Sequence, residues 1–162
     1  MSRAVVRAVG EGERLWFYGG GLHTWKATAS ETDGAFVLFE DEMGQGKTTP
    51  LHRHPDSDET LYMLEGEMLV NIDGHEHRVG PGGVAVTPRG VPHAFLITSP
   101  TARQLCMVTP AGSSEAFFRR ASEPASGDTT VSGSVDSDRV REAAAHTGAI
   151  EILGPPPFQA KK

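Results

Sequence analysis

Residues 46–66 read GKTTPLHRHPDSDETLYMLEG and bring His52, His54 and Glu59 close together in the chain. Side chains two positions apart on a β-strand point to the same face, so both imidazoles can reach one point in space. A carboxylate arriving from the next strand would add negative charge and a possible base. Imidazole and carboxylate ligands together suit divalent first-row transition metals. This stretch therefore predicts a metal site built on β-strands.

A second stretch, residues 82–95, reads GGVAVTPRGVPHAF and presents His93 after a Pro-Arg-Gly turn. The turn residues end one apolar run, and the histidine begins the next. His93 is therefore a candidate to join the first group of ligands from a different strand.

The sequence around these two stretches is made of short runs rich in Val, Leu, Phe and Thr, interrupted by Gly, Pro and Asp. Nineteen glycines and eleven prolines favour many turns. Asp73-Gly74 is a two-residue hairpin signal. We expect strands at residues 15–18, 23–28, 35–41, 60–65, 67–72, 75–79, 83–87, 93–98 and 104–109. This pattern predicts an all-β sandwich or barrel.

The pattern changes after Pro110. SSEAFFRRA has helical spacing, with Ser113 or Ser114 as a possible cap, and residues 121–135 are polar and predict a mobile linker. SDRVREAAAHTG predicts a second helix that ends at Gly148, and the proline-rich tail EILGPPPF is expected to be extended. The expected organisation is a barrel with a short closing helix at 1–120, a linker at 121–135, and a helix with an extended tail at 136–162.

Composition limits the classes of partner. The chain has 162 residues and a net charge of −6, and it contains no Lys/Arg cluster that would neutralise phosphates. We therefore expect neither nucleic acid nor a membrane as a partner. The single cysteine, Cys106, gives no disulfide framework and is expected to be a buried core residue. Without a signal-peptide-like or membrane-spanning run, a cytoplasmic location is expected.

The spacing of the two stretches resembles the paired motifs of the cupin family. The chain agrees at every defining position, which are Gly46, His52, His54, Glu59 and Gly66 in the first motif and Gly82, Pro88, Gly90 and His93 in the second. Ile97 stands where the second motif closes with Asn, a residue that is not a metal ligand in the family. The resemblance implies a cupin barrel, that is, a double-stranded β-helix or jelly roll, here with short C-terminal helices.

By the same resemblance, His52, His54, Glu59 and His93 are the predicted ligands of one divalent ion. The ligand types fit Ni, Mn, Fe, Co, Cu or Zn and do not choose among them. Four other histidines are interpreted differently. His75 and His77 are also two apart, but they lie beside a hairpin turn and are expected to face solvent, and His23 and His146 are expected on the surface.

Strand parity extends the prediction to the wall of the site. If Glu59 and His93 point inward, so do Leu61 and Met63 on one strand and Phe95 and Ile97 on the other. One interpretation is that these apolar residues simply fill a small barrel. As a pocket wall, they would suit a flat aromatic substrate better than a sugar phosphate. Arg53 and Arg89 are expected to face solvent.

Within the cupins, the chain resembles single-domain bacterial quercetinases. The resemblance rests on GAFVLFE, GPGGVAVTPRGVPHAFLITSPTARQL, EAFFRRASEPA and EILGPPPF. It implies a dioxygenase that opens the ring of a flavonol with dioxygen, in which Glu59 is both a ligand and the catalytic base for the substrate hydroxyl. Two alternatives remain open: a cyclase or isomerase of aromatic polyketide assembly using the same metal without oxygen, and a non-catalytic cupin that binds a small effector.

The sequence also predicts a homodimer. A partly open antiparallel barrel leaves strand edges that a second copy can cover, and the strands expected before Gly46 extend the sheet further. The cupin resemblance points the same way. Light scattering at high protein concentration is expected to give twice the mass of the chain, and a monomeric mass would contradict the prediction.

Overall fold

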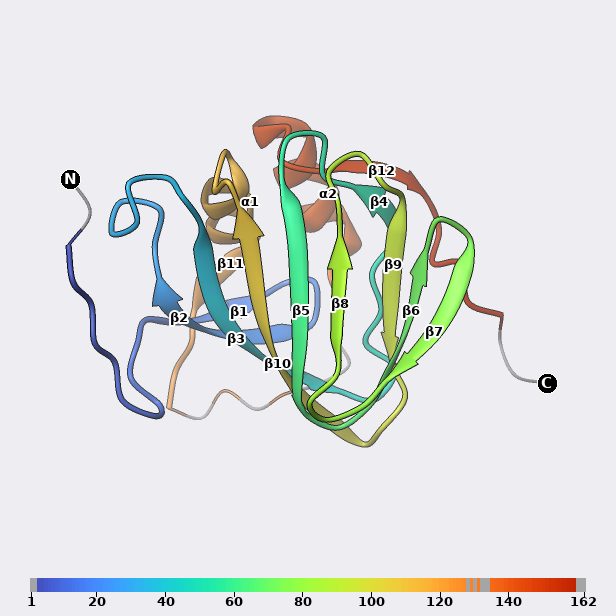
Figure 1. Ribbon diagram of the computed structural model, residues 1–162, viewed down its shortest axis with the longest axis horizontal. Helices are drawn as coiled ribbons and strands as arrows, with labels where there is room; N and C mark the ends of the chain where they lie inside the picture. The colour runs from blue at the N-terminus through green and yellow to red at the C-terminus, as the bar shows by residue number, and fades with distance from the viewer. Residues whose placement is uncertain (1–2, 128, 130, 132–134, 160–162) are drawn as a thin grey trace.

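The computed structural model describes residues 3–127, 129, 131 and 135–159, which fold into two facing antiparallel sheets (Figure 1). The larger sheet has the order β11 (Ser122–Pro124), β1 (Arg14–Phe17), β2 (Gly21–Ala27), β3 (Val37–Gly44), β10 (Thr101–Thr109), β5 (Asp58–Glu65), β8 (Val84–Thr87). The smaller has the order β12 (Glu151–Gly154), β4 (Leu51–Arg53), β9 (His93–Ile97), β6 (Met68–Ile72), β7 (His75–Val79). The expected all-β barrel is confirmed.

The core lies between the two sheets because the strands alternate in burial. Along β3 every second residue is buried, so Val37, Phe39 and Met43 face inward together with the polar Asp41. Burial of alternate side chains against a second sheet is the usual way such a barrel is stabilised. The same alternation in β5 turns Glu59 and Leu61 inward. The strand alternation therefore directs a polar side chain such as Glu59 inward in the same way as its apolar neighbours.

Two helices and the tail strand lie at one end of the barrel (Figure 1). Helix α1 spans Ser114–Arg120, and Ser113 precedes it without a side-chain capping bond. Helix α2 spans Ser137–Thr147; the Asp136 carboxylate accepts a bond from the backbone of Arg139, and Gly148 ends the helix with a φ of 67°. Neither helix is long and apolar enough to cross a membrane.

Two short strands were not expected. Ser122–Pro124, at the start of the stretch predicted as a mobile linker, forms β11 and pairs with β1. Residues 128, 130 and 132–134 of that stretch lie outside the described part of the chain. The tail, expected to be extended and to dock on the barrel or on a partner subunit, forms β12 and pairs with β4, where Ile152 lies opposite His52. Three or four residues are too few to show an alternation in sequence, so tertiary pairing decided both strands.

Gly66 occupies the tight turn between β5 and β6. Its φ is 81°, and a Cβ at this position would lie 2.4 Å from the carbonyl oxygen of Thr101. Gly74 has the same φ in the β6–β7 turn, but a Cβ there would meet nothing within 4 Å. The two glycines share a backbone conformation and differ in the space around them.

We expect Gly66→Ala to destabilise the protein more than Gly74→Ala. Each alanine would carry the cost of a left-handed conformation, about 1–2 kcal/mol. Only Gly66→Ala adds a collision with the backbone of β10. The free energies of unfolding from urea denaturation, at equal metal content, provide the measurement. Equal losses in the two variants would show that the close approach is not a constraint.

Candidate metal centre

Three buried histidines meet at the end of the barrel that the helices and β12 occupy. His52 lies on β4 and is paired directly with His93 at the start of β9, and His54 follows β4 by one residue. One potential ligand atom from each lies within 4.8 Å of those of the other two. Strand pairing and strand parity therefore bring together residues that are about forty positions apart in sequence.

The ring orientations suit metal binding. Nδ1 of His52 lies 2.8 Å from the Pro50 carbonyl oxygen, and Nδ1 of His93 lies 3.0 Å from that of Val91. An Nδ1–H group that donates to a backbone carbonyl leaves Nε2 with its lone pair for a metal. Neither ring nitrogen of His54 makes a hydrogen bond within the described residues, although both are buried. Such unpartnered nitrogens fit a site completed by a cation.

Glu59 enters the site from β5 in the opposite sheet. Its Oε2 lies 3.2 Å from Nε2 of His54, and its Oε1 lies 3.3 Å from Nε2 of His93. The first contact lacks the alignment of a hydrogen bond, whereas the second has it. The structure thus places all four predicted ligands together. The role of Glu59 as a fourth ligand remains a prediction, since the cluster of mutually close ligand atoms contains the three histidines.

Burial and charge set the protonation of these groups. Burial, reinforced by the neighbouring His93, lowers the pKa of His52 to about 3, so this imidazole is neutral at pH 7. Burial also opposes protonation of His93, but the hydrogen bond and charge of Glu59 outweigh it and raise its pKa. Burial favours a neutral Glu59, yet His54 and His93 hold its pKa well below the usual value. Three imidazoles with one carboxylate match the ligand preferences of first-row divalent metals.

The site opens into a cavity of about 650 Å³. Leu61 and Phe95 line it, as strand parity predicts. Met63 and Ile97, predicted as wall residues with them, are fully buried in the core and do not line the cavity. The helix–tail end contributes further apolar lining from residues such as Val140, Ile152 and Pro155. Two of the four predicted wall residues therefore line the cavity and two are core residues, and a role of any of them in binding a substrate stays a prediction.

The same cavity contains a polar group that sequence reasoning missed. It consists of His23, Asp41, Lys47 and Gln104, all buried and all lining the cavity. The expectation that His23 lies on the surface is wrong: it is 1% exposed and stacks against Phe17 and Phe39. The signal that could have found this group is parity, because Asp41 alternates with inward apolar residues along β3.

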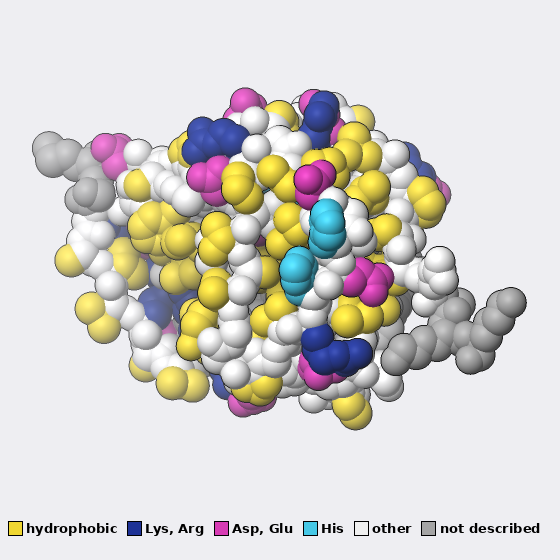
Figure 2. All heavy atoms as spheres, turned by 45° about the vertical axis from the view of Figure 1, so that its right-hand side comes forward, with side chains coloured by type: hydrophobic (Ala, Val, Ile, Leu, Met, Phe, Trp, Pro, Cys, Tyr) yellow, Lys and Arg dark blue, Asp and Glu magenta, His cyan; other side chains and the backbone are white. Residues whose placement is uncertain are grey.

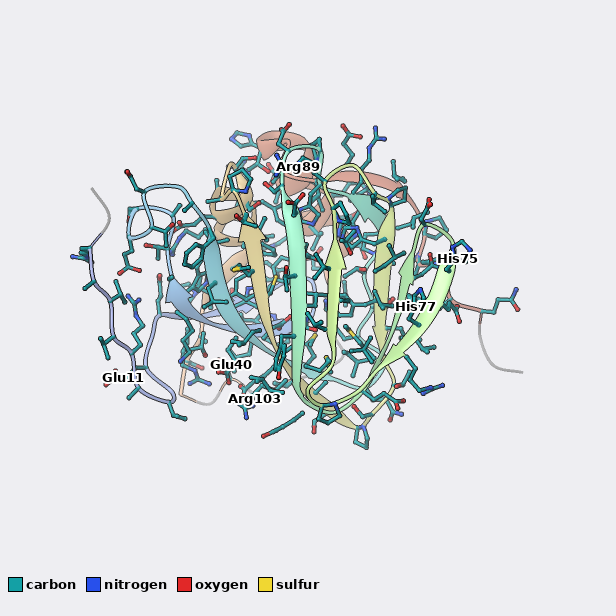
Figure 3. All side chains as sticks on the ribbon, viewed as in Figure 1. Glu11, Glu40, His75, His77, Arg89 and Arg103 are labelled. Atoms are coloured by element: carbon teal, nitrogen blue, oxygen red, sulfur yellow. The ribbon has the colours of Figure 1, made fainter. Side chains whose placement is uncertain are left out.

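The other residues predicted to face solvent are exposed, except that Arg53 is partly buried. His75 and His77 lie on the β7 edge, well away from the centre of the barrel (Figure 3), and histidine side chains are visible on the molecular surface in Figure 2. His146 is exposed on α2. Arg53 forms an ion pair with Glu151, and Arg89 forms one with Asp58. These residues take no part in the cavity.

We expect His93→Ala to remove the bound metal. The substitution deletes the histidine that pairs with His52 and contacts Glu59, leaving two imidazoles for the ion. Elemental analysis should show loss of most of the metal, whereas His77→Ala on the exposed edge should retain it. Metal binding by the unmodified protein should weaken at acid pH, because imidazole must be neutral to ligate. Unchanged metal coordination in His93→Ala, measured by X-ray absorption, would contradict the assignment.

Comparison with known proteins agrees with this geometry. Residues 37–109 match the family model described as "Cupin domain". Quercetin 2,3-dioxygenase of Bacillus subtilis is 34% identical over 118 residues, which are 73% of this chain and 34% of that protein. Dimethylsulfoniopropionate lyase of Ruegeria pomeroyi is 37% identical over 67 residues, or 41% of this chain and 31% of that protein. The chain thus spans about a third of the length of each of these relatives.

A solved structure shows the same architecture. The RmlC-like cupin of Shewanella frigidimarina superposes with a TM-score of 0.59 at 20% identity, covering 68% of this chain and 96% of the other. At that identity the likeness concerns the fold alone. The matched family model, read with the two facing sheets, identifies residues 37–109 of this chain as a cupin domain.

Proposed function

We propose that the protein is a metal-dependent dioxygenase that opens the ring of a flavonol or of a related enolisable aromatic ketone. The observation that carries the proposal is a cluster of three buried histidines with a carboxylate against it, at the end of a largely apolar cavity. The similarity to a quercetin 2,3-dioxygenase supports the substrate class.

The cavity suits a flat aromatic ligand. Phe95 and Leu61 line it beside the cluster, and apolar residues of α2 and the tail line the adjoining side. Burying an aromatic ligand against such a surface supplies binding energy without demanding many polar contacts. A bound divalent metal would supply Lewis acidity to the keto-enol oxygens and access to dioxygen chemistry. His52, His54 and His93 would hold it, with Glu59 as the fourth ligand.

The contacts of Glu59 support a role as a base. Its carboxylate oxygens lie 3.2 Å and 3.3 Å from the Nε2 atoms of His54 and His93, and Glu59 also lines the cavity. A substrate hydroxyl that approached the same point would come within hydrogen-bond reach of one of these oxygens. Glu59 would accept the hydroxyl proton, and the substrate would bind as its more reactive anion.

Two other functions use the same site without oxygen. A polyketide cyclase or isomerase would need only Lewis acidity, and the similarity to a dimethylsulfoniopropionate lyase adds an elimination reaction to this group. A non-catalytic binding protein would need no reaction at all. Turnover of a flavonol panel with and without dioxygen separates these functions, since only the dioxygenase consumes oxygen in proportion to substrate.

We expect Glu59→Gln to retain most of the metal and to lose turnover by about a hundredfold to ten-thousandfold, the usual worth of general acid–base catalysis. Glutamine keeps the shape and one coordinating oxygen but has no basicity. Oxygen uptake with a flavonol, expressed per bound metal, provides the measurement. Higher pH, which supplies the substrate already deprotonated, should recover part of the rate.

Glu76→Gln is the matched control, because it makes the same change on the exposed β7 strand and should alter neither metal content nor rate. If Glu59→Gln loses metal and activity in equal proportion, Glu59 is a ligand only. Unchanged activity per bound metal would refute the proposed base.

A further inference from the structure

The cavity contains a second polar group at a different level of the barrel from the histidine cluster. His23, Asp41 and Gln104 are direct cross-strand partners on β2, β3 and β10, so their inward side chains form one row across the large sheet. Glu59 lies four residues along β5 from Met63, the partner of Gln104 in that row. Four residues of strand span roughly 13 Å. The row and the histidine cluster therefore lie at different positions along one cavity, while the charge of Glu59 still acts on the pKa of both Asp41 and Lys47.

The row contains polar atoms that no described residue satisfies. Nδ1 of His23, Oδ1 of Asp41 and Oε1 of Gln104 are buried and make no hydrogen bond within the described part of the chain. Nε2 of His23 lies 3.6 Å from the Asp41 carboxylate, and the stacked ring of Phe39 fixes the imidazole. A buried polar atom without a partner costs about 1–3 kcal/mol. A bound ligand that supplies the missing hydrogen-bond partner would remove this free-energy cost.

Lys47 completes the group from the opposite side. Its chain segment hydrogen-bonds to β9, and its ammonium lies 4.0 Å from the centre of the Phe95 ring, inside the cavity. No ion pair joins this ammonium to a carboxylate of the described residues. Burial lowers the pKa of Lys47, while the nearby Asp41 opposes that shift. The group thus combines one strong donor with acceptors on Asp41 and Gln104.

This combination selects the chemistry of the ligand. A carboxylate or phosphate would meet the repulsion of Asp41, and an amine would meet that of Lys47. A hydroxyl group both donates and accepts, so it can satisfy the acceptors of the row and the ammonium together. Burial raises the pKa of Asp41 to about 7 against the effects of Lys47 and Gln104, which leaves this carboxyl able to take either role toward a hydroxyl.

We propose that Lys47, Asp41, Gln104 and His23 form a second subsite that binds ring hydroxyl groups of an aromatic ligand whose other end reaches the histidine cluster. Between this subsite and the histidine cluster the cavity wall is apolar, since Phe39 and Leu61 both line it. The subsite makes the protein selective for polyhydroxylated aromatic ligands over unsubstituted ones. It rests on the proposed function for the choice of ligand class.

The test compares quercetin with 3-hydroxyflavone, which share the 3-hydroxy-4-keto group but differ in their outer ring hydroxyls. Dissociation constants are measured anaerobically by flavonol absorbance, at equal metal content. The variants are Lys47→Met and Gln104→Met, which remove the polar end while conserving most of the side-chain volume. Lys26→Met is the matched control, because the Lys26 ammonium donates to the backbone carbonyl of Glu11 at an exposed position and does not line the cavity.

The unmodified protein should bind quercetin at least about tenfold more tightly than 3-hydroxyflavone. Each cavity variant should lower that ratio by about tenfold while leaving the affinity for 3-hydroxyflavone within about twofold, and Lys26→Met should keep the ratio. An unchanged ratio in both cavity variants, or no binding of either flavonol, overturns the subsite. Selective binding without oxygen uptake would instead refute the proposed reaction and leave the subsite standing.

Discussion

The structure depends on holding ionisable groups inside an apolar barrel. Three imidazoles and a carboxylate lie within a few ångströms of one another, nearly all shielded from water. Burying such groups is unfavourable unless each finds a partner. Backbone carbonyls lie within hydrogen-bond distance of Nδ1 of His52 and of His93, and the Glu59 carboxylate contacts His54 and His93 from the opposite sheet. Among the described residues, the nitrogens of His54 make no hydrogen bond. A divalent cation would resolve this arrangement, and without one it is a cost that the rest of the fold must offset.

The two sheets contribute different residues to the site. The smaller sheet supplies histidines from β4 and β9, and β12 covers the outer edge of β4 by pairing with it. The larger sheet supplies Glu59 and the row of His23, Asp41 and Gln104. Because a cavity lies between the sheets, a ligand in it would contact both. Under the proposed function, reaction chemistry and ligand selection would therefore lie at different positions along one barrel.

The buried polar side chains of the histidine cluster and those of the row differ in their contacts. At the metal centre, every side chain contacts another member of the cluster. In the row, three buried atoms have no hydrogen-bond partner among the described residues, and the buried Lys47 ammonium packs against the Phe95 ring. A purely structural core would place apolar residues at these positions, as it does at Met63 and Ile97. His23, Asp41 and Gln104 depart from that pattern and all line the cavity, which is why we assign the row to ligand binding.

The sequence alone determined the fold class, most strands and the grouping of His52, His54, Glu59 and His93. Short alternating runs, turn residues and fixed motif spacing are local signals, and parity converts them into sides of a sheet. Only the tertiary structure decided that β11 and β12 pair, that Met63 and Ile97 lie in the core, and that His23 is buried beside Asp41 and Gln104. Those outcomes depend on which strands become neighbours. The alternation of residues within one strand shows which side chains share a face, but it does not show which strand pairs with it.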